Sequence, residues 1–299
     1  MQKSTLLAWS LLILLATIWG SSFILIKKGL LGLTPQEVGS FRIVAASVVL
    51  LPFAILRLRS FPKKRLGYLL ASGFLGSLLP SFLFAVAQTQ LESAITGVLN
   101  GLVPIFTILI ALVLFNQKQR PKVYLGVAIG FIGTAILVTA NGKSFSGINI
   151  YALLVVLATL CYASNLNLIK QKLNNIHPVT VTSGSLALVG PLSIVFLFGF
   201  TDYWNKFLKV EGILEASFYI ALLGIFGTAF ALVIFNKILQ MTDPLFASSV
   251  TYIIPIVAVV WGILDGEHIY FVQYIGMVAV GVGVYIANGS RSGLKKNRK

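Results

Sequence analysis

The sequence predicts an all-α integral membrane protein whose ten transmembrane helices form two inverted five-helix repeats. Three observations lead to this fold class. Of the 299 residues, 57% are hydrophobic and only 10% are charged, against about 25% charged residues in soluble domains. Uncharged apolar runs of roughly membrane-spanning length recur along the chain, and the two halves of the chain share residues at constant offsets. Such a chain cannot cover itself with a charged surface, so its main solvent is lipid.

Ten uncharged runs define the expected helices. Most reach the length of about 20 residues that a helix needs to cross hydrocarbon. The alternation typical of membrane β-barrels is absent, and a helix satisfies its own backbone groups in lipid. The runs are Ser4–Ile26, Ile43–Leu56, Gly67–Leu91, Ser93–Gln117, Val123–Gly142, Ser144–Ile169, Leu173–Thr201, Ala216–Asn236, Pro244–Leu264 and Ile269–Ser290. The second run extends back to about Val38 if Arg42 is tolerated within the helix.

The basic residues predict the topology. If the N-terminus is inside, 17 of the 23 Lys and Arg residues fall on the inner side and five on the outer side, and Arg42 lies within a span. Cytoplasmic loops carry the excess of positive charge, so we expect a multi-pass protein of the cell (inner) membrane with both termini in the cytoplasm. We interpret the net charge of +15 as a sign of the orientation in the membrane, not of nucleic-acid binding.

The two halves of the chain resemble each other. At an offset of 143, Trp19-Gly20-Ser21-Ser22 matches Tyr162-Ala163-Ser164-Asn165. At an offset of 151, Gly73, Gly76, Phe84 and Pro104 match Gly224, Gly227, Phe235 and Pro255. Five helices per half is an odd number, so the second copy enters the membrane upside down, as in many secondary transporters. The expected units are residues 1–142, residues 143–290 and a basic cytoplasmic tail, 291–299.

Polar and aromatic side chains at mid-span depth form the candidate substrate-binding set. Polar groups in lipid are costly unless they are paired or face water, and a proline one turn after such a residue frees a backbone carbonyl. Each of these side chains could instead form hydrogen bonds that hold packed helices together. The set is Trp19, Ser22, Gln88, Asn100, Tyr162, Asn165, Asn236 and Tyr252.

Two further features have alternative interpretations. Arg42 lies about 6 Å in from Val38 at a rise of about 1.5 Å per residue. It could attract an anionic group, but we favour snorkelling to the outer headgroups, or pairing with Glu37 or an exposed carbonyl. Gly126-x-x-x-Gly130 permits close helix packing, which we expect within the first repeat.

Several classes of function lack their motifs. The single cysteine, Cys161, allows no intrachain disulfide, and no Cys/His cluster suggests a metal site. Neither HExxH, a GxSxG-type motif, paired mid-span aspartates nor GxxxxGK[ST] occurs, so an enzyme or an ATP-driven pump is not expected. We expect no cofactor, and the expected partners are a small-molecule substrate and membrane lipids, with no nucleic acid.

The order of these motifs resembles the drug/metabolite transporter superfamily, and specifically its EamA-type ten-helix transporters. The matching residues are Ile18-Trp19-Gly20-Ser21-Ser22-Phe23, Phe41-Arg42, Pro104, Gly126, Gly133, Pro255, Gly266-Glu267, Gly276 and Gly281. The family often has Gly-Glu after helices 4 and 9, and the first copy here reads Asn116-Gln117 instead. The resemblance implies a carrier, usually an exporter of amino acids or related metabolites.

Together these features predict a secondary transporter that moves a small neutral or zwitterionic metabolite by alternating access. The alternative on the same scaffold is a flippase for a lipid or a lipid-linked headgroup.

Overall fold

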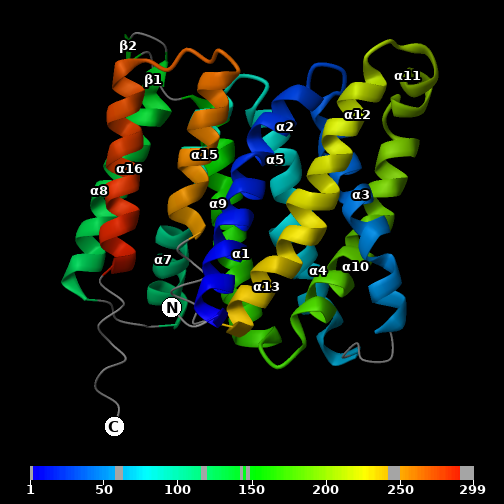
Figure 1. Cartoon of the computed structure of the whole chain (residues 1–299), viewed down its shortest axis with the longest axis horizontal. Helices are drawn as coiled ribbons and strands as arrows, with labels where there is room; N and C mark the ends of the chain where they lie inside the picture. Colours follow the sequence, from blue (N-terminus) through cyan, green and yellow to red (C-terminus); the bar gives the residue numbers. More distant parts are fainter. Residues whose placement is uncertain are drawn as a thin grey trace.

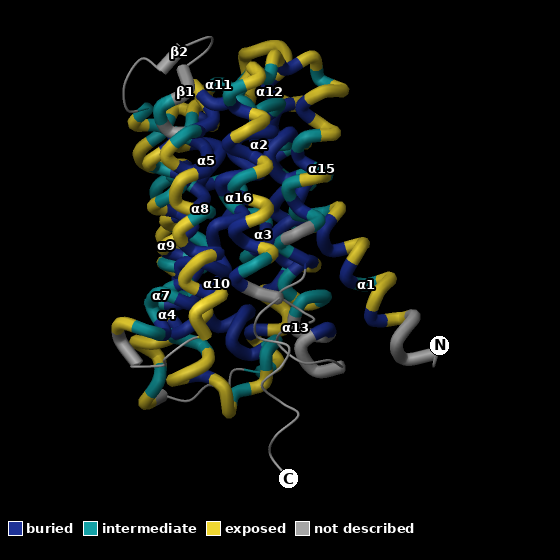
Figure 2. Tube along the Cα trace, turned by 90° about the vertical axis from the view of Figure 1, so that its left-hand side faces the viewer, coloured by how far each residue is buried: buried dark blue, intermediate teal, exposed yellow. Residues whose placement is uncertain are grey.

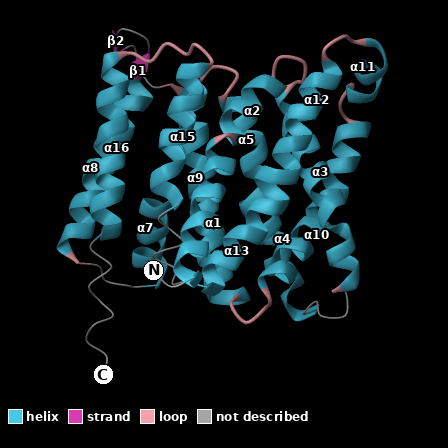
Figure 3. Cartoon of the chain, in the orientation of Figure 1, coloured by secondary structure: helices cyan, strands magenta, loops and turns pink. Residues whose placement is uncertain are grey.

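The computed structural model describes residues 3–57, 63–115, 120–141, 144–145, 149–241 and 250–289. Its helices run side by side along one common direction, and the connections gather at the two ends of the bundle (Figures 1 and 3). Helix α1 starts and helix α16 stops at the same end, which we call the termini end; the opposite end is called the outer end (Figure 1). Asn116-Gln117, Lys143 and the tail from 291 to 299 lie outside the described residues.

Almost all described elements are helical. The first half contains α1 (Lys3–Gly20), α2 (Ser22–Gly29), α3 (Pro35–Leu56), η2 (Lys63–Arg65), α4 (Leu66–Gly73), η3 (Phe74–Leu78), α5 (Leu79–Ala87), α6 (Ser93–Asn100), α7 (Val103–Phe115) and α8 (Pro121–Thr139). The second half contains α9 (Ile150–Leu168), η4 (Ile169–Leu173), α10 (Pro178–Gly199), α11 (Tyr203–Lys209), α12 (Ile213–Leu222), η5 (Leu223–Phe230), α13 (Ala231–Met241), α15 (Val250–Leu264) and α16 (Phe271–Gly289). Between them, β1 (Ala140–Asn141) pairs antiparallel with β2 (Ser144–Phe145).

Within the described residues, seven helical stretches are long and apolar enough to cross a membrane. They are Leu7–Gly29, Pro35–Leu56, Leu66–Ala87, Ser93–Val113, Ile150–Leu173, Pro178–Gly199 and Ile213–Phe235, and three shorter apolar helices cover Pro121–Leu137, Ile253–Leu264 and Phe271–Ala287. The predicted multi-pass helical membrane protein is therefore confirmed. The count of ten spans and the inverted repeat stay predictions.

The first two spans differ from the expected boundaries for local reasons. The first helix continues to Gly29, so Lys27 and Lys28 belong to its last turn and do not lie in a loop. The second begins at Pro35, because Thr34 and Glu37 form a reciprocal capping box at its start. Basic residues in a last turn and a capping box in a first turn both satisfy free backbone groups at helix ends.

Several spans are interrupted near their middle. The first breaks between α1 and α2 at Ser21, and the fourth breaks between α6 and α7 at Gly101-Leu102, just before Pro104. The third and eighth contain the π-helical segments η3 and η5. Such irregular turns expose backbone carbonyls, and in lipid they occur only where protein or a cavity covers them.

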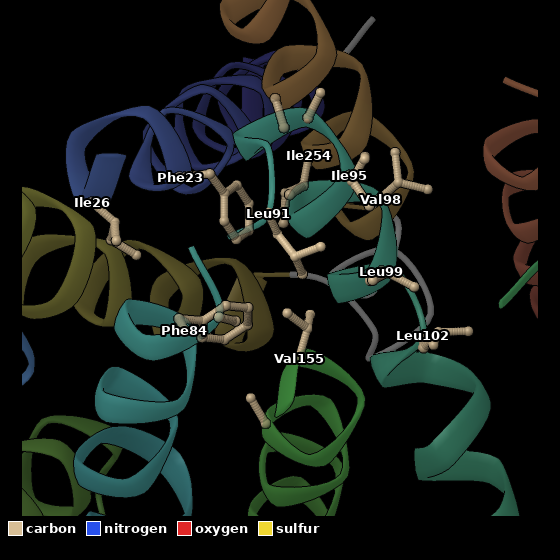
Figure 4. Packing of buried hydrophobic residues seen from close by; sticks show 14 of the residues in the cluster. Phe23, Ile26, Phe84, Leu91, Ile95, Val98, Leu99, Leu102, Val155 and Ile254 are labelled. Carbon is tan, nitrogen blue, oxygen red and sulfur yellow. The ribbon is translucent and has the colours of Figure 1, made fainter. Parts of the chain in front are cut away.

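Buried side chains fill the centre of the bundle, while exposed residues lie around its outside (Figure 2). Phe23, Phe84 and Leu99 belong to the largest cluster, which joins helices from both halves of the chain (Figure 4). The two phenyl rings lie 5.7 Å apart between centroids. The exposed apolar side chains on the outside are suited to contact with acyl chains.

Glycines bring α8 and α16 into backbone contact at one edge of the bundle (Figure 1). A Cβ atom added at Gly133 would lie 2.6 Å from the backbone nitrogen of Val280, and one at Gly283 would lie 2.6 Å from the Cα of Gly130. The expectation that Gly126-x-x-x-Gly130 packs within the first repeat is therefore wrong. Its partner is α16 in the second half, because Gly283 faces this stripe.

The Gly283 contact can be tested with a matched glycine on the same helix. We expect Gly283→Ala to lower the melting temperature, because a Cβ there overpacks a backbone contact at a cost of about 1–3 kcal/mol. Gly281→Ala should leave the melting temperature unchanged or slightly raised, since nothing lies within 4 Å of a Cβ at this position. Thermal unfolding in detergent compares the two variants, and equal melting temperatures would contradict the packing described.

Two exposed residues test the topology: Lys64 in η2, in the connection between α3 and α4, and Glu211 in the connection between α11 and α12. These two connections lie at opposite ends of the bundle (Figure 1). In a chain carrying Cys161→Ser, we expect Lys64→Cys to react with an impermeant thiol reagent only from the cytoplasmic side. Glu211→Cys should react only from the outer side. Labelling of both cysteines from one side would rule out the expected orientation.

Candidate functional site

The break in the first span is built from contacts with the second half of the chain. The Trp19 indole Nε1 donates a hydrogen bond of 3.0 Å to the Gly227 carbonyl in η5, and its ring lies 5.4 Å from that of Phe235. Ser21 Oγ accepts a hydrogen bond of 2.8 Å from Trp261 Nε1 in α15. At Gly20, an added Cβ would lie 3.0 Å from the carbonyl oxygen of Ile254. The motif around Trp19 therefore joins the two halves near mid-span.

Residues 162 to 165 make the reciprocal contact. The Tyr162 ring stacks on Phe84 of α5 with centroids 6.0 Å apart. One turn further along α9, the Asn165 side chain occupies the space that the missing side chain of Gly76 in η3 leaves. In the other half, Ser22 Oγ lies beside Gly227 in the same way. The residues paired by the two sequence offsets thus meet across the halves.

Arg42 is the functional candidate that the sequence analysis left out of the predicted site. Its Nε donates a hydrogen bond of 3.1 Å to Thr228 Oγ1, and its guanidinium also interacts with the Tyr162 hydroxyl. Thr228 is buried and lies past the midpoint of the span Ile213–Phe235. The favoured interpretation, snorkelling or pairing with Glu37, is therefore wrong.

Among the residues that the structure describes, three side-chain amide oxygens are buried without a hydrogen-bond partner. They belong to Gln88, Asn100 and Asn165. Gln88 caps the C-terminus of α5 at the outer end, where its Nε2 donates to the Phe23 carbonyl at 2.9 Å, so it lies nearer the membrane surface than expected. Asn100 ends α6 at the break before Pro104. Buried acceptors that lack donors are rare in proteins, so they are candidates for contact with a ligand.

The two remaining predicted residues lie in helices whose backbone the structure describes. Their side chains lie outside the described part. Asn236 belongs to α13 and Tyr252 to α15. Their place in the binding set stays a prediction.

An ion-pair cluster closes the outer end between the two halves. Lys27 Nζ lies 2.9 Å from both Asp265 Oδ2 and Glu267 Oε1 and 3.5 Å from Glu92 Oε2. The Glu267 side chain is fully buried. Its Oε1 accepts hydrogen bonds from the Ser93 nitrogen and hydroxyl at 2.9 and 2.6 Å, and its Oε2 accepts one from the Ala94 nitrogen at 3.0 Å. A glutamate of the second half therefore caps α6 of the first half.

The backbone around Gly266 places this carboxylate. Two residues after the end of α15, Gly266 has a φ of +77°, a left-handed conformation that favours glycine. The Glu267 nitrogen then donates back to the Gly262 carbonyl at 2.9 Å, as in a Schellman motif. This turn explains the Gly-Glu pair that the sequence analysis could not assign a role.

The charges in the cluster perturb one another. Burial acts to raise the pKa of the Glu267 carboxyl, but hydrogen bonds from Ser93, Ala94 and Lys27 outweigh it, and the pKa lies below its usual value. Burial and the Glu267 charge raise the pKa of Glu92. Hydrogen bonds from Lys28 and Lys27 lower the pKa of Asp265. Glu267 and Asp265 are therefore ionised at neutral pH and hold the lysines in place.

A second buried acid stabilises the outer end elsewhere. Glu37 accepts hydrogen bonds from Lys206 of α11 at 2.9 and 3.0 Å. Beside this pair, an open apolar hollow of about 800 Å³ is lined by aromatic residues such as Phe41, Trp204 and Phe207. The hollow contains none of the predicted site residues.

Comparison with known proteins agrees with this architecture. The sequence profile of the EamA-like transporter family matches residues 6–139 and again residues 149–289. The uncharacterized inner membrane transporter YedA of Escherichia coli (strain K12) is 27% identical over 90% of this chain and 85% of its own. An uncharacterized transporter of Archaeoglobus fulgidus is 26% identical over 93% of this chain and 97% of its own.

Two further comparisons are more distant. The S-adenosylmethionine/S-adenosylhomocysteine transporter of Chlamydia muridarum is 24% identical over 86% of this chain and 84% of its own. One crystal structure superposes with a TM-score of 0.63, at 14% identity, over 94% of this chain and 96% of the other, which shows a shared fold. The helical bundle and these relatives define a multi-pass membrane transporter. The chain belongs to the EamA-like transporter family.

Two asparagines distinguish ligand contact from helix packing. Asn100 has a buried Oδ1 without a partner, whereas Asn167 donates to the carbonyls of Ala163 and Thr107 at 2.9 and 3.2 Å. We expect Asn100→Ala to weaken substrate affinity several-fold, the scale of a lost hydrogen bond of about 0.5–1.5 kcal/mol, with little change in melting temperature.

Asn167→Ala is the matched control for helix packing. It should lower the melting temperature and spare substrate affinity, because interhelical hydrogen bonds in membranes average about 0.6 kcal/mol each. Melting and binding measured on both purified variants decide the assignment. Unchanged affinity with a lowered melting point in Asn100→Ala would remove Asn100 from the site.

Proposed function

We propose that this protein is a secondary transporter that exports a small zwitterionic or neutral metabolite, such as an amino acid, by alternating access. The observation that carries the proposal is the meeting of polar and aromatic side chains from both halves at mid-span depth. Trp19 contacts Gly227, and Arg42 contacts Thr228 and Tyr162. In carriers built from repeats, substrate binds near the midplane between the repeats.

The reciprocal contacts support an inverted repeat. Ser22 lies against Gly227 and Asn165 against Gly76, and these four residues are equivalent under the two sequence offsets. A pseudo-two-fold axis in the membrane plane would produce such a pair of contacts. The broken and π-helical turns at this depth expose backbone groups where a substrate could use them.

The ion-pair cluster supports a gating role for the outer end. Lys27 and Ser93 from the first half bind Glu267 from the second. Because the carboxylate is fully buried, the two halves cannot separate here unless these bonds exchange for water. We infer that the structure is closed at its outer end and that opening this end breaks the Glu267 contacts.

The chemistry of the predicted site favours a small solute over a polyanion. A phosphorylated sugar would need several cations at depth, and among the site residues that the structure describes only Arg42 is charged. The relative from Chlamydia muridarum is named for S-adenosylmethionine and S-adenosylhomocysteine, which both carry the ammonium and carboxylate of an amino acid. Export follows the direction usual for EamA-type carriers.

Transport in proteoliposomes tests this function. We expect saturable movement of one or more radiolabelled amino acids, measured in vesicles of both orientations with and without a proton gradient. Transport of a phosphorylated sugar or nucleotide alone would contradict the proposed substrate class. Scrambling of a fluorescent lipid without solute flux would establish the flippase instead.

The gate is tested by removing one charge. Glu267→Gln keeps the side-chain shape but weakens the bonds to Lys27 and Ser93. We expect a cysteine introduced at Leu91, a buried position in the loop before α6, to react faster with an outer impermeant thiol reagent in this variant. Glu215→Gln is the control, since that exposed carboxylate contacts Tyr219 on its own helix. Equal reaction rates in the two variants would argue against an outer gate at Glu267.

A further inference from the structure

Arg42 is placed unusually deep for a charged residue in a membrane helix. The span begins at Pro35, so Arg42 lies about 10 Å along the helix from the outer end at a rise of about 1.5 Å per residue. Its side chain reaches further inward to Thr228. Cationic groups at this depth are expensive and mark substrate or ion pathways unless an acid neutralises them.

No described carboxylate pairs with Arg42. The nearest acid on its own helix, Glu37, is bound by Lys206 from α11 and by the capping box at Thr34. Within the described chain, Arg42 contacts two hydroxyl groups, those of Thr228 and Tyr162. A guanidinium has five N–H donors in a planar fork that fits a carboxylate, and two hydroxyls leave part of this fork without an anionic acceptor.

The backbone is shaped to bring Arg42 to this position. At Gly224 in η5, an added Cβ would lie 2.6 Å from the Arg42 carbonyl oxygen and 2.7 Å from the Cβ of Ala45. The absence of a side chain at Gly224 lets α3 lie directly against η5. Thr228 follows one turn later and receives the guanidinium. The close packing of α3 on η5 therefore sets the depth of the charge.

A complementary acceptor lies one helical turn from the same contact. Tyr162 and Asn165 are three residues apart on α9 and share one face. Asn165 Oδ1 is buried and has no hydrogen-bond partner in the part of the chain that the structure describes. An ammonium group has three donors and no acceptor, so it can donate to the Asn165 oxygen. A carboxylate can in turn accept hydrogen bonds from the guanidinium of Arg42.

We propose that Arg42 binds the α-carboxylate of the transported solute, with Thr228 and Tyr162 orienting the guanidinium and Asn165 Oδ1 accepting from the α-ammonium. This proposal rests on the proposed transport function and narrows its substrate class to free α-amino acids and solutes that keep the α-amino-acid group. The single positive charge suits one carboxylate. A phosphate dianion would leave a buried negative charge without a partner.

Pairs of amino acids and their α-amides test the assignment, because the amide removes the carboxylate charge and keeps the side chain and the amino group. The probes are L-leucine with L-leucinamide, L-phenylalanine with L-phenylalaninamide and L-tryptophan with L-tryptophanamide. Binding to the purified full chain is measured by calorimetry. We expect at least one acid to bind at least tenfold more tightly than its amide.

Substitutions at Arg42 separate recognition from folding. In Arg42→Gln the acid should lose tenfold or more in affinity while the amide keeps its affinity, so that the preference disappears. Arg42→Lys keeps the charge and should retain part of the preference. Arg57→Gln is the matched control, because Arg57 lies at the opposite end of α3 and contacts Thr180; it should leave both affinities unchanged.

The outcomes distinguish this proposal from the broader function. Acids and amides bound equally by the unaltered protein, or equal losses for both in Arg42→Gln, would overturn the role of Arg42 and leave an amino-acid-derived substrate in place. Failure of every acid and every amide to bind would overturn the proposed substrate class itself, and the role of Arg42 with it. A lowered melting temperature with an unchanged acid-to-amide ratio would make Arg42 a structural residue.

Discussion

Hydrocarbon offers no hydrogen-bonding partner, so every polar group inside the bundle depends on another group of the protein. This constraint explains why polar side chains of the first span have hydrogen-bond partners within the protein. The Trp19 indole donates to a backbone carbonyl that the π-helical segment η5 exposes, and Ser21 accepts from Trp261. The same constraint makes the exceptions informative. Within the described chain the Asn165 oxygen has no hydrogen-bond partner and the Arg42 guanidinium has no anionic partner, and Tyr162, which contacts Arg42, lies one turn before Asn165 on α9.

The outer end follows the same rule with full charges. Burying Glu267 would be prohibitive if it stood alone, but four contacts from Lys27, Ser93 and Ala94 compensate for the lost water. Each of these contacts crosses from one half of the chain to the other. Directional bonds therefore join the two halves at the outer end, and such bonds can exchange for water in the opening that we propose.

Periodicity and charge were sufficient to predict the helical membrane fold, because span length and the lysine and arginine distribution are local properties of the chain. The capping box at Thr34 was also visible in principle, since it needs only Thr and Glu three residues apart. The sequence offered an anionic contact as one interpretation of Arg42 but could not decide between the alternatives, because the position of the guanidinium depends on Gly224, which lies 182 positions away in the sequence. Likewise, the sequence analysis placed Asn100 but not Asn167 in the candidate set, yet the pattern alone could not show which of the two side chains has hydrogen-bond partners. Only the three-dimensional contacts show that one amide is satisfied and the other has an oxygen without a partner.

The backbone contact between α8 and α16 limits how this molecule can change shape. Helices that touch through Gly130 and Gly283 have no side chains between them to tilt or slide past one another. One of these helices belongs to the first half of the chain and the other to the second. A motion that separated the two halves at this edge would break this backbone contact, so we expect α8 and α16 to keep their contact and move together in the proposed transport cycle.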